Sequence, residues 1–154
     1  MGLFVALVIV TLPWFKGYLP LPPQKAPLLS LETPVRSTAW LLEHSPPGRL
    51  FHHMSYGSYL IWAAPGRYQV FVDPRVELYS PEIWQEYEVL SRGGPGWERL
   101  VKKWGVRTMM LDTAQQNGLV KAALASGKWV EVARFGGTVL MEERHSKDEE
   151  DGGG

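Results

Sequence analysis

The sequence predicts an α/β fold: a small three-layer domain with a mostly parallel sheet and a terminal antiparallel hairpin. Two observations carry this prediction. First, short apolar runs alternate with helical patterns through residues 33–144, and strands that alternate with helices favour a parallel sheet covered on both faces. Second, the pair Gly136-Gly137 joins two strand-like runs and suits a tight hairpin turn. A chain of 154 residues is long enough to bury the core of one such domain.

The pattern of apolar, proline and glycine residues predicts ten elements along the chain. They are a helix over 33–44, a strand beginning at 50, a helix over 55–62, a strand over 68–72, helices over 81–90 and 97–104, a strand over 106–111, a helix over 113–126, and hairpin strands over 129–135 and 138–141. Thr33 is expected to cap the first helix, with Pro34 at its first position, and Pro46-Pro47-Gly48 ends it. Ser55 is expected to cap the second helix, which Pro65-Gly66 stops.

The later elements show similar signals. Tyr68–Val72 is an apolar run that must end at Asp73-Pro74, because proline lacks a backbone donor and fixes φ. Pro81 opens the next helix, and Gly93-Gly94-Pro95-Gly96 separates it from the one that follows. Gly105 is expected to cap that second helix at its carboxyl end.

Both ends of the chain differ from this domain in composition. Residues 1–15 are an apolar run without charge that ends in aromatic residues, and we interpret them as the end of a transmembrane helix, about four residues short of a full span. The alternative is a buried core helix or an uncleaved anchor. Prolines cluster in residues 16–32, which predicts an extended linker. Residues 145–154 are highly charged and are expected to form a disordered acidic tail.

Composition and spacing exclude several classes of function. Lysine plus arginine equal aspartate plus glutamate at 16 each, so no net charge favours nucleic acid as a partner. The absence of cysteine excludes disulfides, thiolate metal sites and a cysteine nucleophile. The histidines lack metal-ligand spacing and no serine lies in a nucleophile elbow, so we expect no metal, no cofactor and no catalytic residue. The run Gly93-Gly94-Pro95-Gly96 follows a helix and lacks the residues of a phosphate loop.

The best candidate for a binding site is the loop after Tyr68–Val72. Strands 68–72 and 106–111 are expected to be parallel neighbours, which would place Asp73 and Asp112 at one edge of the sheet, where α/β proteins bind ligands. Arg75 is a planar donor that can hold a phosphate or carboxylate in two places. The alternative is an internal Asp73–Arg75 pair that only ties down the loop.

Two segments of the chain also resemble a known family. They are Tyr56-Gly57-Ser58-Tyr59-Leu60-Ile61-Trp62 and Val72-Asp73-Pro74-Arg75-Val76-Glu77-Leu78-Tyr79. Both are similar to the carboxy-terminal soluble domain of bacterial polytopic membrane proteins that resemble GT-C type glycosyltransferases, the group of the dolichyl-phosphate-mannose protein mannosyltransferases. Pro74 stands where that family usually has glycine, which stiffens the turn. On these segments the candidate binding residues are Asp73, Arg75, Glu77, Tyr79 and Tyr56.

The resemblance implies an accessory role. The catalytic acids of GT-C enzymes lie in an early extracytoplasmic loop, so none is expected in this chain. The domain would stand on the extracytoplasmic side of the cell membrane, cover the active-site mouth and help bind a polyisoprenyl-phosphate-linked sugar or an acceptor. Its partners would be the membrane, through residues 1–15, and the membrane-embedded part of the same protein.

Two other functions stay open at this point. One is a non-catalytic binding or interaction module of a membrane protein, which docks a partner through its tryptophan-rich surfaces. The other is a free soluble enzyme. On sidedness, Lys16 and Lys25 follow the apolar run and, taken alone, favour a cytoplasmic domain.

Overall fold

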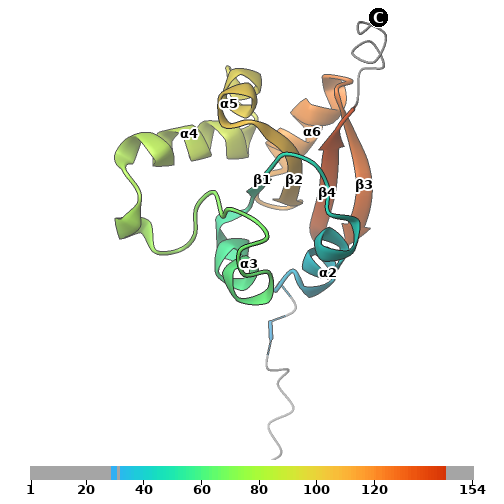
Figure 1. The fold of residues 1–154 in the computed structure, drawn as a ribbon. Coiled ribbons are helices and arrows are strands. Elements are labelled where there is room, and N and C mark those ends of the chain that lie inside the picture. Colours follow the sequence, from blue (N-terminus) through green and yellow to red (C-terminus); the bar gives the residue numbers. More distant parts are fainter. Residues whose placement is uncertain (1–28, 31, 145–154) are drawn as a thin grey trace, which may run out of the picture. The chain divides into compact units, whose positions relative to one another are not determined.

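The computed structural model describes residues 29, 30 and 32–144. Residues 32–144 belong to the second of two units into which the chain divides, Leu31–Gly154. The elements, labelled in Figure 1 where there is room, are α2 (Val35–His44), β1 (Arg49–His52), the 3₁₀ turn η2 (Met54–Tyr56), α3 (Gly57–Ala63), the 3₁₀ turn η3 (Val76–Leu78), α4 (Pro81–Arg92), α5 (Trp97–Trp104), β2 (Val106–Asp112), α6 (Asn117–Ala125), β3 (Trp129–Phe135) and β4 (Thr138–Glu143). The α/β class is confirmed.

The four strands form one mixed sheet in the order β1-β2-β4-β3. Only β1 and β2 are parallel, whereas β4 runs antiparallel to both β2 and β3. The expected mostly parallel sheet is therefore wrong. The terminal hairpin is confirmed, with Gly136 at φ 58° in its turn. The hairpin supplies two of the four strands and places β4 beside the central strand, so antiparallel pairs outnumber the parallel one.

The segment Tyr68–Val72 is not a strand, and the prediction that it pairs with residues 106–111 is wrong. β1 occupies that position, with Phe51 opposite Met109. The segment instead passes β1, the edge strand, and its apolar side chains divide between the two cores of the domain. Strand pairing does not satisfy the Phe71 N–H; it donates instead to the side-chain atom His52 Nε2 at 3.0 Å.

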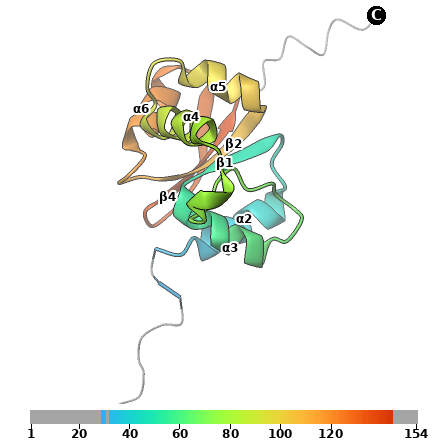
Figure 2. The same ribbon diagram turned by 90° about the vertical axis from the view of Figure 1, so that its left-hand side faces the viewer.

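Helices cover both faces of the sheet, which gives three layers. Helices α4, α5 and α6 lie on one face and α2 and α3 on the other, as Figure 2 shows. Side chains that alternate along β2 point into different cores: Met109 and Leu111 pack with Leu90 and Leu119, whereas Met110 packs under α2 and α3. The core under α4, α5 and α6 is the larger of the two.

Three helix starts differ from the expectation. The N-terminus of α2 has no side-chain cap, and the Thr33 carbonyl accepts the Val35 N–H instead. Ser55 does not cap α3 but lies within the turn η2. Helix α6 begins at Asn117 rather than at residue 113, because the Asp112 carboxylate holds the intervening residues in a turn. The carboxyl-terminal cap at Gly105, with φ 63°, is confirmed.

In the part of the chain that the structure describes, no helix has both the length and the apolar character needed to cross a bilayer. The expectations for a membrane helix at 1–15 and a tail at 145–154, and most of the linker expected over 16–32, concern residues outside that part.

Candidate functional site

The loop predicted as a binding site is built around one buried carboxylate. The Asp73 side chain is 1% exposed and accepts four hydrogen bonds. Its Oδ1 receives the backbone N–H of Arg75 at 2.9 Å and Arg75 Nε at 3.0 Å, and its Oδ2 receives Arg75 Nη2 at 2.7 Å and the Tyr79 hydroxyl at 2.9 Å. The loop is therefore tied to a single anchoring point. Asp73 ends no strand, so its place is fixed by these bonds and by packing.

These bonds also set the charge of the loop. Hydrogen bonding from the Arg75 guanidinium, against the effect of burial, holds the pKa of Asp73 well below its usual range, so the carboxylate is ionised. The Nε and Nη2 edge of Arg75, one of the two edges with which a guanidinium can bind a phosphate in two places, is directed at Asp73. The geometry thus favours the internal pair over an anion site at Arg75.

The tip of the loop presents apolar side chains to solvent. Val76 and Leu78, in the turn η3, are 54% and 60% exposed, and Glu77 between them is also exposed. The turn is held by α4, because Trp84 Nε1 donates to the Val76 carbonyl at 3.2 Å. Glu77 contributes nothing to the Asp73 anchor and stands alone at the tip among the predicted site residues.

Tyr56 lies at a second cluster, away from the loop tip. Its hydroxyl donates to Asp112 Oδ2 at 3.1 Å and lies 3.0 Å from Thr138 Oγ1. Burial raises the pKa of Tyr56 to about 12, so the phenol is neutral. Asp112 in turn accepts the N–H of Ala114 and of Gln115 on Oδ1. This cluster fastens the carboxyl end of β2 to the start of the hairpin strand β4.

The two clusters are joined through the residue after Tyr56. A Cβ at Gly57 would lie 2.7 Å from both the Asp73 Cβ and the Val72 carbonyl oxygen, so α3 begins in close contact with the base of the loop. Asp73 and Asp112 are thus connected through α3 rather than through adjacent strand ends. Tyr56 and the loop belong to one packed region but do not form one site.

A polar group that no sequence signal indicates lies at the carboxyl end of β1. His53 Nδ1 is 2.7 Å from Ser55 Oγ, and burial lowers the pKa of His53. His52 beside it is fully buried, and burial lowers its pKa to about 4. No sequence motif marks this pair of histidines, since strand alternation alone predicts only that they face opposite ways. Among the described residues, no three histidine, aspartate or glutamate side chains are grouped so that they could hold a metal ion.

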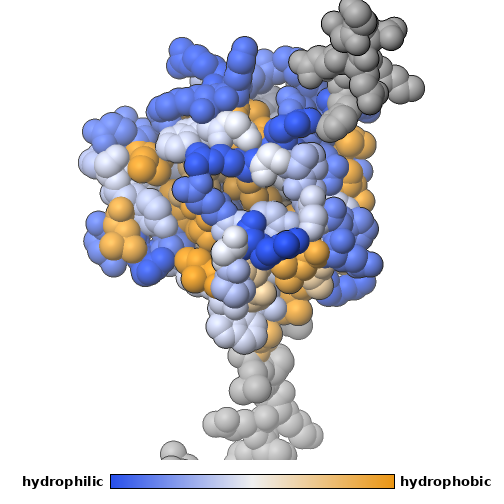
Figure 3. All heavy atoms as spheres, viewed as in Figure 1, coloured by the Kyte–Doolittle hydropathy of each residue, from blue (hydrophilic) through white to orange (hydrophobic). Residues whose placement is uncertain are grey.

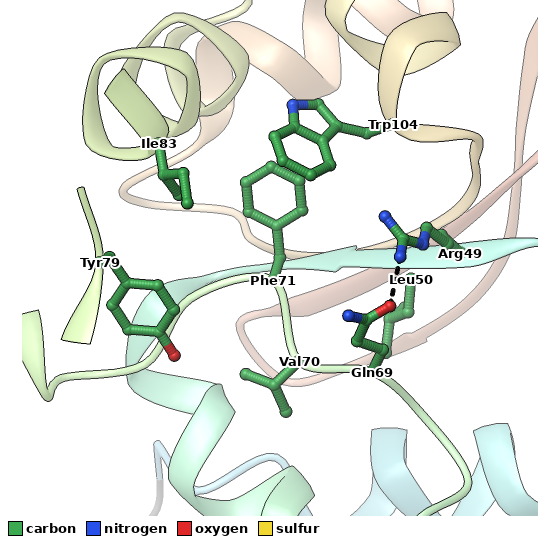
Figure 4. Close-up of a pocket in the computed structure, with 8 residues that line it drawn as sticks. All are labelled: Arg49, Leu50, Gln69, Val70, Phe71, Tyr79, Ile83 and Trp104. Carbon is green, nitrogen blue, oxygen red and sulfur yellow. Dashed lines mark hydrogen bonds between the residues drawn. The ribbon is translucent and has the colours of Figure 1, made fainter. Parts of the chain in front are cut away.

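A pocket of about 200 Å³ lies between β1, the Gln69–Phe71 segment, and the helices α4 and α5. Its lining is mostly apolar: Leu50, Val70, Phe71, Tyr79, Ile83 and Trp104, with Arg49 and Gln69 as the polar members. Figure 4 shows Arg49 and Gln69 on one side, Tyr79 and Ile83 on the other, and the rings of Phe71 and Trp104 between them. Of the predicted site residues, only Tyr79 lines it.

The surroundings of this pocket can be followed on the molecular surface. In the view of Figure 3, apolar residues reach the surface between α4 and α3, and hydrophilic residues surround them. The sequence signal that could have found the pocket is weak, because its lining residues come from four separate segments. Only the position of Trp104 at the end of a predicted helix was foreseeable.

Comparisons with protein-family models, with curated proteins and with solved structures found no match for this chain.

Proposed function

We propose that the folded unit is a non-catalytic binding domain of a membrane protein, and that the tip of loop 73–79 faces the membrane side. The observation that carries the proposal is that the charged and the apolar side chains of this loop have different surroundings. Its carboxylate and guanidinium bind each other, whereas its exposed tip presents Val76 and Leu78 on either side of Glu77. A loop that keeps apolar residues in water while holding a fixed shape is suited to docking on an apolar surface.

The rigidity of the tip supports this function. Exposed apolar residues on a loose loop lose conformational entropy when they bind, and that loss weakens binding. Here the Asp73 anchor and the Trp84 bond to the Val76 carbonyl fix both ends of η3 before any partner arrives. Trp62 on α3, which is 73% exposed, adds an amphipathic side chain of the kind enriched at membrane interfaces. The uncharged run Gly2–Phe15 is the segment that would hold the chain at the bilayer.

A fluorescence experiment on the full chain tests the membrane-facing loop. The chain has no cysteine, so Leu78→Cys introduces one labelling site for an environment-sensitive dye. We expect the dye at residue 78 to shift its emission to the blue when the chain binds vesicles of phosphatidylcholine and phosphatidylglycerol. The matched control is Leu124→Cys on α6, where the native leucine is 47% exposed, and there no shift is expected. A chain that binds vesicles but shows no shift at residue 78, or equal shifts at both sites, would contradict the proposal.

A narrower proposal concerns the parent protein. The resemblance of residues 56–62 and 72–79 to GT-C-like membrane proteins supports an accessory extracytoplasmic domain of a glycosyltransferase that uses a polyisoprenyl-phosphate-linked sugar. In that role the domain would cover the active-site mouth and help bind the donor or the acceptor. The genomic sequence upstream tests this: several hydrophobic spans and an early loop with an acidic pair are expected. An open reading frame that encodes this chain alone would exclude the glycosyltransferase while leaving the binding domain intact.

A further inference from the structure

The pocket beside β1 has walls that are held in place from outside the pocket. Its three aromatic residues each make a hydrogen bond to a group behind them. These bonds run from the Phe71 N–H to His52 Nε2 at 3.0 Å, from Trp104 Nε1 to Glu86 Oε2 at 2.7 Å, and from the Tyr79 hydroxyl to Asp73 Oδ2 at 2.9 Å. Phe71 and Trp104 also meet edge to face, with ring centroids 5.1 Å apart. The pocket is therefore preorganised, which is a property of binding sites.

The polar side of the pocket carries a positive charge. Arg49 is exposed, and among the described residues its guanidinium has no carboxylate partner. Its bond is to the neutral amide oxygen of Gln69, which fixes the orientation of the guanidinium at the pocket (Figure 4). A guanidinium has five donors in a planar fork, so most of them remain available to a carboxylate.

Size and chemistry then define the ligand. A cavity of about 150 Å³ holds a benzene ring, and this pocket of about 200 Å³ has room for one ring with a short substituent. Aromatic rings favour the edge-to-face contacts that Phe71 and Trp104 offer. We propose that this pocket binds a small aromatic carboxylate, with its ring against Phe71, Trp104 and Ile83 and its carboxylate on Arg49. The proposed site does not include the docking tip Val76–Leu78.

Nuclear magnetic resonance with phenylacetate as the probe tests this site. In the ¹⁵N-labelled full chain, the indole N–H signal of Trp104, assigned by Trp104→Phe, should move saturably as phenylacetate is added. The uncharged analogue phenylacetamide should bind about tenfold more weakly, because it cannot make the charge-assisted pair with Arg49. Ile83→Trp, which fills the pocket, should abolish the shift for both compounds.

The charge contribution is separated by a matched pair of variants. Arg49→Met keeps the apolar stem and should weaken phenylacetate about tenfold while leaving phenylacetamide unchanged. Arg99→Met on α5 removes another exposed arginine and should change neither. Unperturbed backbone spectra of the variants would show that the fold is intact. No movement of the Trp104 signal, or equal affinity of Arg49→Met and Arg99→Met for phenylacetate, would overturn the proposal.

Discussion

Two neighbouring regions of this domain differ in how their charged side chains are bonded. In the loop 73–79, Asp73 is buried and accepts hydrogen bonds from Arg75 and Tyr79. In the pocket beside β1, Arg49 is exposed and is bound to a neutral amide. Tyr79 belongs to both, because its hydroxyl joins the loop anchor while its ring lines the pocket. Asp73 and Arg75, which the sequence marks as candidate binding residues, thus stabilise the loop. Arg49, which the sequence does not mark, keeps most of its donors available.

The largest expected effect tests the structural half of this comparison. Asp73→Ala should lower the free energy of unfolding by about 4 kcal/mol, because the Arg75 backbone N–H and the Tyr79 hydroxyl both lose their acceptor. Arg75→Ala should cost less, since the backbone N–H and the Tyr79 hydroxyl still satisfy Asp73. Urea unfolding of both variants measures the two losses. If Arg75→Ala were the more destabilising change, the loop anchor would be wrongly assigned.

The next effect depends on pH and concerns His52, which holds the pocket wall through Phe71. Burial lowers the pKa of His52 from 6.5 to about 4, so the unfolded chain binds the proton more readily than the folded one between these values. Stability present above pH 6.5 should be lost as the pH falls toward 4, by about 3 kcal/mol in all. Asp73 contributes little in this window, because its stabilisation is lost only as the pH falls below the ordinary pKa of about 3.8, where the unfolded carboxyl is protonated.

Unfolding at about pH 7.5 and about pH 4.5 measures the His52 effect. The control is His52→Gln, whose amide oxygen replaces Nε2 as the acceptor of the Phe71 N–H and does not titrate. His53 shifts in the same direction, so some pH dependence should remain in this variant. A pH dependence identical to that of the unmodified chain would show that His52 is not the responsible group.

A smaller effect tests the contact between α3 and the loop base. Alanine normally stabilises a helix relative to glycine, but at Gly57 its Cβ would lie 2.7 Å from Asp73 Cβ and from a backbone oxygen. Gly57→Ala should therefore destabilise the domain by about 2 kcal/mol. Ser58→Ala, at the exposed next position of α3, is the control and should be close to neutral. A stabilising Gly57→Ala would mean that the loop can move away without loss.

The smallest effect sharpens the other half of the comparison. Arg49→Met should change the free energy of unfolding by less than about 0.5 kcal/mol, because the side chain is exposed and its partner is neutral. Thermal unfolding beside Asp73→Ala makes the contrast direct. A loss as large as that of Asp73→Ala would assign Arg49 a structural role and weaken the case for a ligand at the pocket.

Local signals in the sequence were sufficient for much of the fold. Gly105 ends α5, Gly136-Gly137 turns the hairpin, and Pro81 opens α4, because each depends on backbone preferences of one or two residues. The strand predicted over Tyr68–Val72 is wrong because that prediction rested on composition alone. An apolar run has the composition of a buried strand, but composition does not reveal whether neighbours can complete its ladder.

In the candidate site, too, some features follow from local sequence and others from tertiary contacts. The sequence by itself determined that Asp73, Pro74 and Arg75 form a tight turn, since an aspartate followed two residues later by an arginine can close a local pair, and it left open whether that pair binds a ligand. Only the tertiary structure decided that Asp73 is buried and that its pair with Arg75 is internal, and that Arg49, Phe71, Tyr79 and Trp104 surround one pocket. The physical reason is range: turns and caps follow from covalent neighbours, whereas burial and pocket walls follow from contacts between residues far apart in the chain.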